Sequence, residues 1–155
     1  MVGAERITDR VTSQGLATKH MVLEITESAA MTDLARALEN LTRLRMKGFV
    51  LSIDDYGTGY SSMQQLSRIP FGELKIDQSF VFSALEKEPS KVILASSLDM
   101  ARKLKLEAVA EGVETRAHWD LLQNLGCDIA QGYFIARPMD SAAFLAWARD
   151  WKPPN

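Results

Sequence analysis

Two adjacent carboxylates, Asp54 and Asp55, stand directly before a glycine-rich stretch in the segment SIDDYGTGYSS, residues 52–62. An isolated Asp-Asp-Tyr-Gly string is ordinary turn chemistry, because Asp side chains hydrogen-bond to nearby backbone and glycine adopts turn conformations. The same pair could instead hold a cation. Adjacent residues of a strand point to opposite faces, so both acids can serve one ion only where the regular pleat stops, as Gly57 and Gly59 would permit.

Acidic residues recur where several β-type runs end, and one lysine and one glutamine accompany them. In parallel βα folds the carboxyl ends of the strands meet at one edge of the sheet, so these groups are expected to lie close together. Crowded carboxylates need a positive partner, because like charges oppose one another's ionisation. Oxygen ligands in this number suit Mg²⁺ or Mn²⁺, and two histidines and one cysteine offer little for zinc. The set comprises Glu24, Glu27, Asp54, Asp55, Lys75, Asp77, Glu111, Glu114 and Gln131.

Several of these residues also have a purely structural explanation. Glu24 and Glu27 could lie on the solvated face of a helix, and Glu114 could favour the dipole of a helix that begins beside it. A lysine such as Lys75 is usually a surface residue. The recurrence of acids at successive strand ends is what favours a site, because chance seldom arranges it.

Helix patterns separate the β-type runs. Gly48 stands where a left-handed C-terminal cap would end a leucine-rich helix. Ser90 is predicted to cap a second long helix with Pro89 just outside it, and Thr115 a third that stops at Gly126. A short helix is predicted over 61–68, ended by Pro70. Further helices are predicted over 4–14 and 141–151, and the leucine-rich helix covers 33–47.

The β-type runs alternate with these helices along the whole chain. This alternation favours right-handed βαβ units and a mainly parallel sheet. The spacing between strand starts is close to that of a (β/α) barrel, so the fold class is predicted to be α/β, a partial TIM-like barrel of about five parallel strands. The runs cover 21–26, 49–54, 73–77, 107–110 and 128–135.

The composition indicates one soluble domain spanning 1–155. Of the 155 residues, 46% are hydrophobic and 25% charged, and no linker or low-complexity segment divides them. The net charge of −2 excludes the basic field that duplex DNA or an anionic membrane would need. Neither a signal sequence nor a membrane-spanning run is present, so a cytoplasmic location is expected.

Five strings of the chain, in order, resemble the successive motifs of the EAL domain, the cyclic di-GMP phosphodiesterase module of bacterial signalling proteins. They are LEITES, LSIDDYGTGYSSMQQL, ELKIDQSFV, EAVAEGVET and DIAQGYFIARPM, and they lie within 22–139. The resemblance implies hydrolysis of one phosphodiester of cyclic di-GMP to linear pGpG, with water displacing the 3′ oxygen in line and two divalent metals, Mg²⁺ or Mn²⁺, in a complete site.

The resemblance also implies roles for particular residues. Glu24 corresponds to a metal ligand, Asp54 to the carboxylate that bridges the two metals, and Asp55 to a ligand of the second metal. Lys75 corresponds to the lysine that contacts the attacking water and the scissile phosphate. Glu111 corresponds to a general base or metal-shell acid.

The remaining matched positions have supporting roles in the family. Gln131 corresponds to a glutamine that positions water. Glu27 corresponds to the glutamate that holds the DDYGTGYSS loop. Asp77 and Glu114 are expected to support the site from outside the set of metal ligands.

The chain departs from the family's pattern before Glu24. The family's Glu-Ala-Leu string and a following Asn-Leu-Ser-like string each supply a metal ligand, and neither occurs in the 23 preceding residues. The chain is therefore expected to be roughly the C-terminal three-fifths of an EAL domain, weakly active or inactive alone. Open strand edges invite pairing with another chain, so a homodimer joined through those edges is predicted.

Three functions remain open on this basis. The first is a metal-dependent phosphodiesterase module, and the second is a noncatalytic module that binds cyclic di-GMP or a protein partner. Absent ligands favour the second, whereas the retained acids, Lys75 and Gln131 favour the first. A Schiff-base enzyme using Lys75 is disfavoured, because such lysines need a desolvated site without surrounding carboxylates.

Overall fold

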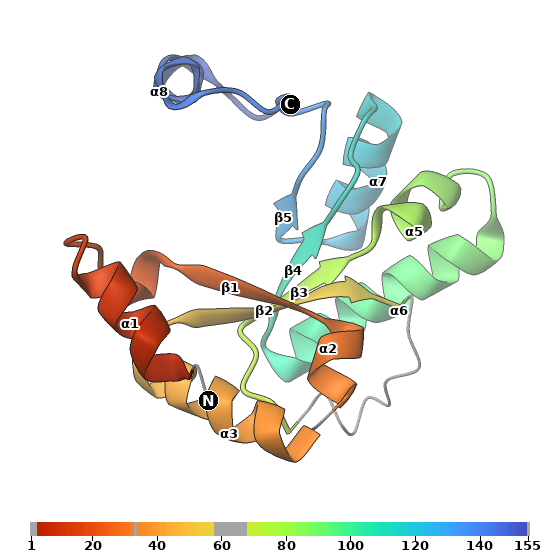
Figure 1. Cartoon of the computed structure of the whole chain (residues 1–155). Coiled ribbons are helices and arrows are strands. Elements are labelled where there is room, and N and C mark those ends of the chain that lie inside the picture. Colours follow the sequence, from red (N-terminus) through yellow and green to blue (C-terminus); the bar gives the residue numbers. More distant parts are fainter. Residues whose placement is uncertain (1–2, 33, 58–67, 155) are drawn as a thin grey trace.

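The computed structural model of the chain describes residues 3–32, 34–57 and 68–154. Its centre is a five-stranded sheet in the order β1-β2-β3-β4-β5, and every neighbouring pair is parallel. Figure 1 shows the strands fanning across the molecule in chain order. The strands are β1 (Val22–Thr26), β2 (Val50–Tyr56), β3 (Glu73–Ile76), β4 (Glu107–Ala110) and β5 (Ile129–Ala130).

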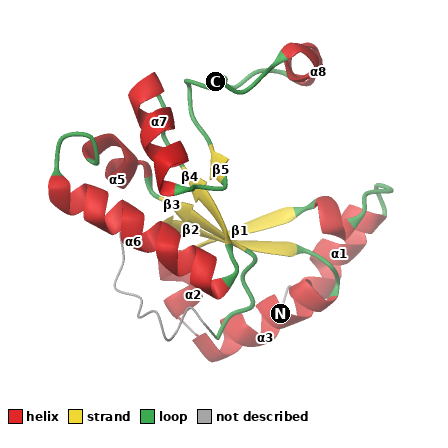
Figure 2. Cartoon of the chain, turned by 180° about the vertical axis from the view of Figure 1, so that it is seen from behind, coloured by secondary structure: helices red, strands yellow, loops and turns green. Residues whose placement is uncertain are grey.

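Helices connect the strands. Helix α6 packs against β3 and β4, α2 packs against β1 and β2, and α3 packs against β2. Figure 2 shows α6 lying across one side of the sheet, with α8 standing apart from it. The helices are α1 (Ala4–Thr12), a 3-10 turn η1 (Thr18–His20), α2 (Glu27–Thr32), α3 (Leu34–Met46), α5 (Gln78–Ser83), α6 (Glu88–Leu104), α7 (Arg116–Leu125) and α8 (Ser141–Asp150).

The two faces of the sheet differ in chemistry because side chains alternate along each strand. One face is apolar and forms the core beneath the helices. The opposite face carries Glu24 and Ser52 side by side, with Asp54 and Lys75 further along their strands. The core face comprises Leu51, Ile53, Leu74, Ile76, Ala108 and Ala110, each at most 1% exposed.

Most predicted helix boundaries agree with the structure, with one clear error. Thr115 caps α7 by accepting a hydrogen bond from the His118 N–H, and Gly126 ends it with φ +70°. Helix α6, however, begins at Glu88, so Pro89 lies inside its first turn and Ser90 is not its cap. Proline is tolerated there because the first helical N–H groups have no partner within the helix.

The fifth strand is much shorter than the predicted 128–135. Pairing with β4 ends at Ala130, and the chain then turns. The turn is held against β4 and its loop, because the Gln131 N–H donates to the Ala110 carbonyl and the Val113 N–H donates to the Gln131 carbonyl, both at 2.9 Å. The apolar residues of the predicted strand that follow Ala130 therefore lie in this turn and not in the sheet. The predicted helix 61–68 lies mainly outside the described residues.

The turn after β5 leaves no room for a side chain at Gly132. An added Cβ would lie 2.2 Å from the Val113 carbonyl oxygen and 2.3 Å from its nitrogen. We expect Gly132→Ala to lower the free energy of unfolding by about 3 kcal/mol, because backbone atoms must move. The control is Gly15→Ala, where φ is +73° but no atom lies within 4 Å of the added Cβ. That change should cost about 1 kcal/mol. Equal losses in urea denaturation of the two variants would contradict this account of Gly132.

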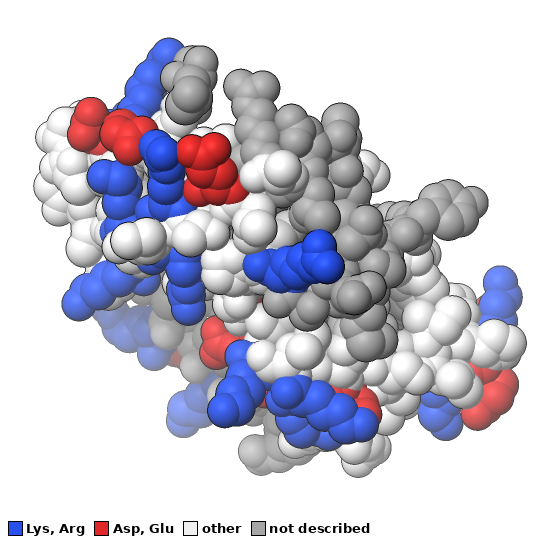
Figure 3. Space-filling model, turned by 90° about the horizontal axis from the view of Figure 1, so that it is seen from below, with Lys and Arg blue, Asp and Glu red and all other residues white. Residues whose placement is uncertain are grey.

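Two further properties bear on function. No helix within residues 3–32, 34–57 and 68–154 is long and apolar enough to cross a membrane. Figure 3 views the molecule from below and shows lysine and arginine side chains in separate groups, with acidic side chains among them.

Candidate active site

A buried lysine lies among three carboxylates at the carboxyl ends of the strands. The Lys75 side chain is 7% exposed, and its Nζ lies 2.8 Å from Glu111, 3.0 Å from Glu24 and 3.1 Å from Asp54. Burial alone would lower the pKa of Lys75, but hydrogen bonds to Glu111, Glu24 and Asp54 outweigh it and raise the pKa above that of a free lysine. Lys75 therefore stays positively charged. Its ion pairs link β3 to β1, to β2 and to the residue that follows β4.

Asp54 and Asp55 reach the same place as Glu111. One carboxylate oxygen of each of the three lies within 4.8 Å of the other two. Adjacent strand residues can do this because Asp55 has φ +57° and the register between β2 and β3 shifts between Ile53 and Tyr56. The pleat is thus interrupted at Asp55 itself, as a β-bulge would do.

This cluster meets the requirements of a hard divalent cation. All three ligand groups offer carboxylate oxygens, the donors that Mg²⁺ and Mn²⁺ prefer. Asp54 Oδ1 is buried and pairs with Lys75 Nζ at 3.1 Å, but Lys75 shares its single positive charge with Glu24 and Glu111. One ammonium cannot balance these three carboxylates and Asp55, and crowded like charges are costly unless a further cation compensates them. The residues therefore fit a metal ion.

Glu27 lies behind the acidic pair, at the first position of α2. Its side chain is buried, and its Oε2 accepts a hydrogen bond of 3.3 Å from the Gly57 N–H. Gly57 itself has φ +100°, and an added Cβ would lie 2.7 Å from the Phe80 ring. Burial and the charge of Glu27 raise the pKa of the neighbouring Tyr56. Glu27 thus contacts Gly57, two residues beyond Asp55.

An open cleft of about 280 Å³ begins beside Glu111 and extends toward the turn after β5. Gln131 lines it, in agreement with its predicted closeness to the site. Gln78 also lines it and was missed by sequence reasoning, although it directly follows the acid that ends β3. The other lining residues are Gly112, Glu114, Gly132 and Tyr133.

Asp77 and Glu114 stay outside the cluster of Asp54, Asp55 and Glu111. Asp77 caps α5, since it accepts hydrogen bonds from the Ser79 N–H at 2.9 Å and from the Ser79 hydroxyl. The Glu114 side chain is exposed at the rim of the cleft, and its backbone N–H donates to His118 Nδ1 at 3.4 Å. Neither acid contacts Lys75 through an ion pair in the described part of the chain.

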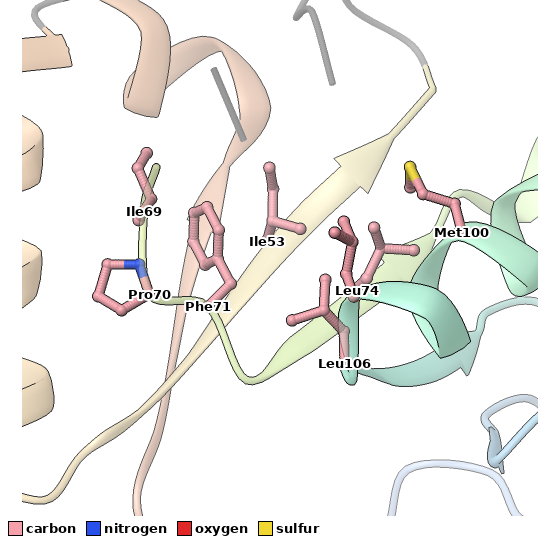
Figure 4. Close-up of a pocket in the computed structure, with 8 residues that line it drawn as sticks. Ile53, Ile69, Pro70, Phe71, Leu74, Met100 and Leu106 are labelled. Atoms are coloured by element: carbon pink, nitrogen blue, oxygen red, sulfur yellow. The ribbon is translucent and has the colours of Figure 1, made fainter. Parts of the chain in front are cut away.

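A second cavity has a different character. It encloses about 220 Å³ between the core face of the sheet and α6, and its lining is apolar (Figure 4). Ile53, Leu74 and Met100 point into it, and its lining includes no charged residue among 3–32, 34–57 and 68–154. The chemistry therefore lies on the opposite face, at the ends of the strands.

The parallel strands joined by helices define an α/β protein of the (β/α)-barrel class. Its acids and buried lysine lie toward the carboxyl ends of the strands, where this class has its functional sites. The particular family follows from its sequence. The sequence profile of the EAL domain matches residues 3–138. The chain belongs to the EAL domain family.

Two curated relatives from Pseudomonas aeruginosa illustrate the family. The bifunctional diguanylate cyclase/cyclic di-GMP phosphodiesterase MucR is 39% identical over 142 residues, which are 92% of this chain and 21% of MucR. The cyclic di-GMP phosphodiesterase RocR is 40% identical over 142 residues, 92% of this chain and 36% of RocR. The chain thus spans about a fifth to a third of the length of these relatives.

Solved structures show the same architecture. The MucR phosphodiesterase in complex with cyclic di-GMP superposes with a TM-score of 0.87 and 38% identity, over 90% of this chain and 57% of that one. The EAL domain of Mycobacterium smegmatis DcpA gives 0.88 and 33%, over 97% and 68%. Klebsiella pneumoniae BlrP1 with manganese and cyclic di-GMP gives 0.81 and 32%, over 86% and 34%. The predicted α/β fold with parallel strands of a TIM-like barrel is confirmed.

Proposed function

We propose that this chain is a cyclic di-GMP phosphodiesterase module that hydrolyses one phosphodiester bond to give linear pGpG. The observation that carries the proposal is the meeting of Asp54, Asp55 and Glu111 within 4.8 Å of one another, beside a buried Lys75. Relatives named as cyclic di-GMP phosphodiesterases support the choice of substrate.

The acids would hold Mg²⁺ or Mn²⁺. Asp54, Asp55 and Glu24 would supply ligands from this chain, and Glu111 lies within 4.8 Å of Asp54 and Asp55. Bound divalent ions of this kind neutralise charge on phosphoryl oxygens and acidify a water molecule.

The remaining groups act on the water and the phosphate. Lys75 is cationic and stands among the carboxylates, so its ammonium donates hydrogen bonds to a phosphoryl oxygen and to the attacking water. Glu111 accepts the proton that this water loses as its oxygen bonds to phosphorus. Gln131, across the cleft from Glu111, orients the water, and the 3′ oxygen departs on the opposite side.

Three further residues, Glu27, Asp77 and Glu114, support the site without binding the metal ions. Glu27 steadies the backbone after Asp55 through its hydrogen bond from the Gly57 N–H. Asp77 keeps the start of α5 in place, next to Gln78 in the wall of the cleft. Glu114 adds negative charge at the rim of the cleft.

A cytoplasmic location of the protein stays a prediction.

Turnover separates this function from the alternative of a noncatalytic receptor. The chain is incubated with cyclic di-GMP and Mn²⁺ or Mg²⁺, and linear pGpG is measured by chromatography. We expect pGpG to form only slowly with either ion, since two of the family's metal ligands do not occur before Glu24, and EDTA to abolish its formation. Cyclic di-GMP binding without any pGpG would favour the receptor, and neither binding nor turnover would contradict both.

The sheet edges predict self-association. Val22 on edge strand β1 and Ile129 on edge strand β5 are 44% and 40% exposed, and Phe144 and Leu145 of α8 are 50% and 66% exposed. Open edges and exposed apolar side chains favour pairing with a second copy. We expect a homodimer in sedimentation velocity at micromolar concentration, and a compact monomer there would contradict the prediction.

A further inference from the structure

Two groups of acids overlap at the carboxyl ends of the strands. The first group pairs with Lys75 Nζ and consists of Glu24 at 3.0 Å, Asp54 at 3.1 Å and Glu111 at 2.8 Å. The second is the three-acid cluster of Asp54, Asp55 and Glu111, with one oxygen of each within 4.8 Å of the other two. Asp54 and Glu111 belong to both groups. Two positions for a positive charge therefore lie next to each other, and Lys75 occupies one of them.

The Lys75 ammonium is held firmly in its position. Strand β3, which carries Lys75, is buried along its whole length and pairs with β2 on one side and β4 on the other. The Lys75 side chain is only 7% exposed. Because the ammonium is part of the chain, its effective concentration at these carboxylates exceeds that of an ion in dilute solution. A divalent ion at the Lys75 position would have to displace it.

The balance of charge favours a single divalent ion beside the ammonium. The two groups together comprise four carboxylates, and Lys75 is the cation that pairs with three of them. One divalent ion leaves a single negative charge on this assembly, whereas two would give it an excess of positive charge. Buried charges are weakly screened, so a second ion would be repelled both by the first ion and by the ammonium.

We propose that this chain binds one divalent ion, at the three-acid cluster, and that the Lys75 ammonium occupies the place of a second ion; the inference rests on the function proposed above. Each carboxylate has two oxygens, so Asp54 and Glu111 can serve the ammonium and the ion at the same time. Glu24 stays paired with Lys75 and becomes a metal ligand only when the ammonium leaves it. The complete site expected from the family resemblance holds two ions, so this chain differs from it in metal content.

Removing the ammonium should open the second position. In Lys75→Met and in Lys75→Gln, the acids Glu24, Asp54 and Glu111 lose their shared cation. The four carboxylates then balance the charge of two divalent ions. Lys75→Arg retains the positive charge, so it should keep the second ion out as the parent chain does.

Titration with Mn²⁺ measures the number of bound ions, with free Mn²⁺ followed by electron paramagnetic resonance. Low-temperature spectra of the bound ions distinguish an isolated ion from a coupled pair a few Å apart. Circular dichroism checks that each variant is folded during the titration. Lys103→Met is the matched control, because Lys103 pairs with Asp99 at 2.7 Å but its side chain is 75% exposed.

We expect the parent chain, Lys75→Arg and Lys103→Met to bind about one Mn²⁺ per chain, with the spectrum of an isolated ion. Lys75→Met and Lys75→Gln should bind about two, with the spectrum of a coupled pair. Two ions in the parent chain or in Lys75→Arg, or only one in both uncharged variants, would overturn the inference and leave the proposed function intact. A parent chain that binds no Mn²⁺ would contradict the proposed function, and the inference with it.

Discussion

Replacing Glu111 with glutamine is expected to slow cyclic di-GMP hydrolysis in Mn²⁺ by about 10³-fold, as losses of a base or a metal-site charge typically do. Glu111 is the acid closest to Lys75 Nζ, at 2.8 Å, and it also belongs to the cluster with Asp54 and Asp55. The amide keeps the size of the side chain but removes both the negative charge and the proton acceptor. The rate of pGpG formation at saturating substrate measures the effect.

The matched control for Glu111→Gln is Glu107→Gln. Glu107 begins the same strand, β4, and its side chain is exposed. The control should retain the parent rate within about twofold, since surface changes seldom perturb the structure. A Glu111→Gln rate within tenfold of the parent would show that the proton acceptor lies elsewhere.

Lys75→Met is expected to destabilise the fold by about 3 kcal/mol, because removing one partner leaves buried charges uncompensated. Lys75 is the shared ion-pair partner of Glu24, Asp54 and Glu111, and Asp54 and Glu111 are only 23% and 19% exposed. Addition of Mg²⁺ should restore part of the loss, since the cation replaces the missing positive charge. Mg²⁺ should therefore raise the melting temperature more in the variant than in the parent chain.

Lys103→Met provides the comparison for Lys75→Met. Lys103 forms an ion pair of 2.7 Å with Asp99, but its side chain is 75% exposed. Exposed pairs contribute little, so this variant should lose much less stability than Lys75→Met and show no enhanced response to Mg²⁺. Equal stability of the two variants would contradict the role given to Lys75.

The raised pKa of Lys75 also fixes a pH dependence of stability. The folded chain keeps this proton where an unfolded lysine, with a pKa of about 10.4, has lost it. Its contribution is complete below about pH 10 and is lost as pH rises further. Tyr56 acts in the same direction because burial raises its pKa. Lys75→Met should therefore show a smaller alkaline loss of stability than the parent chain.

The sequence predicted that acidic residues meet at one edge of the sheet, because the ends of strands can be predicted from the hydrophobic pattern. Glu111 directly follows β4, whereas Glu24 and Asp54 lie within β1 and β2, and parallel pairing brings all three to Lys75. The way Asp55 joins them was predicted only in part. A break in the pleat was expected from Gly57 and Gly59. Gly57 does have φ +100° and Gly59 lies outside the described residues, but Asp55, with φ +57°, already has positive φ within the strand. Aspartate tolerates that conformation, so a glycine search alone misses it.

Features that depend on tertiary packing were not readable in the same way. The end of β5 is set by the close contact of Gly132 with Val113. The order of apolar and polar residues around Gly132 does not predict that contact. The acid Asp77 ends a strand like the others, yet it caps α5 because Ser79 lies two residues beyond it. Strand-end position therefore identifies candidates, and geometry selects among them.

Parallel measurement of Mn²⁺ binding and cyclic di-GMP turnover tests the central claim most directly. Mn²⁺ is titrated into the chain and into Asp55→Asn, free Mn²⁺ is followed by electron paramagnetic resonance, and pGpG is quantified in the same samples. The account predicts that turnover rises with bound Mn²⁺ in the parent chain, and that Asp55→Asn weakens binding and turnover together. Turnover that does not depend on Mn²⁺, or an Asp55→Asn variant that binds and hydrolyses like the parent chain, would contradict it.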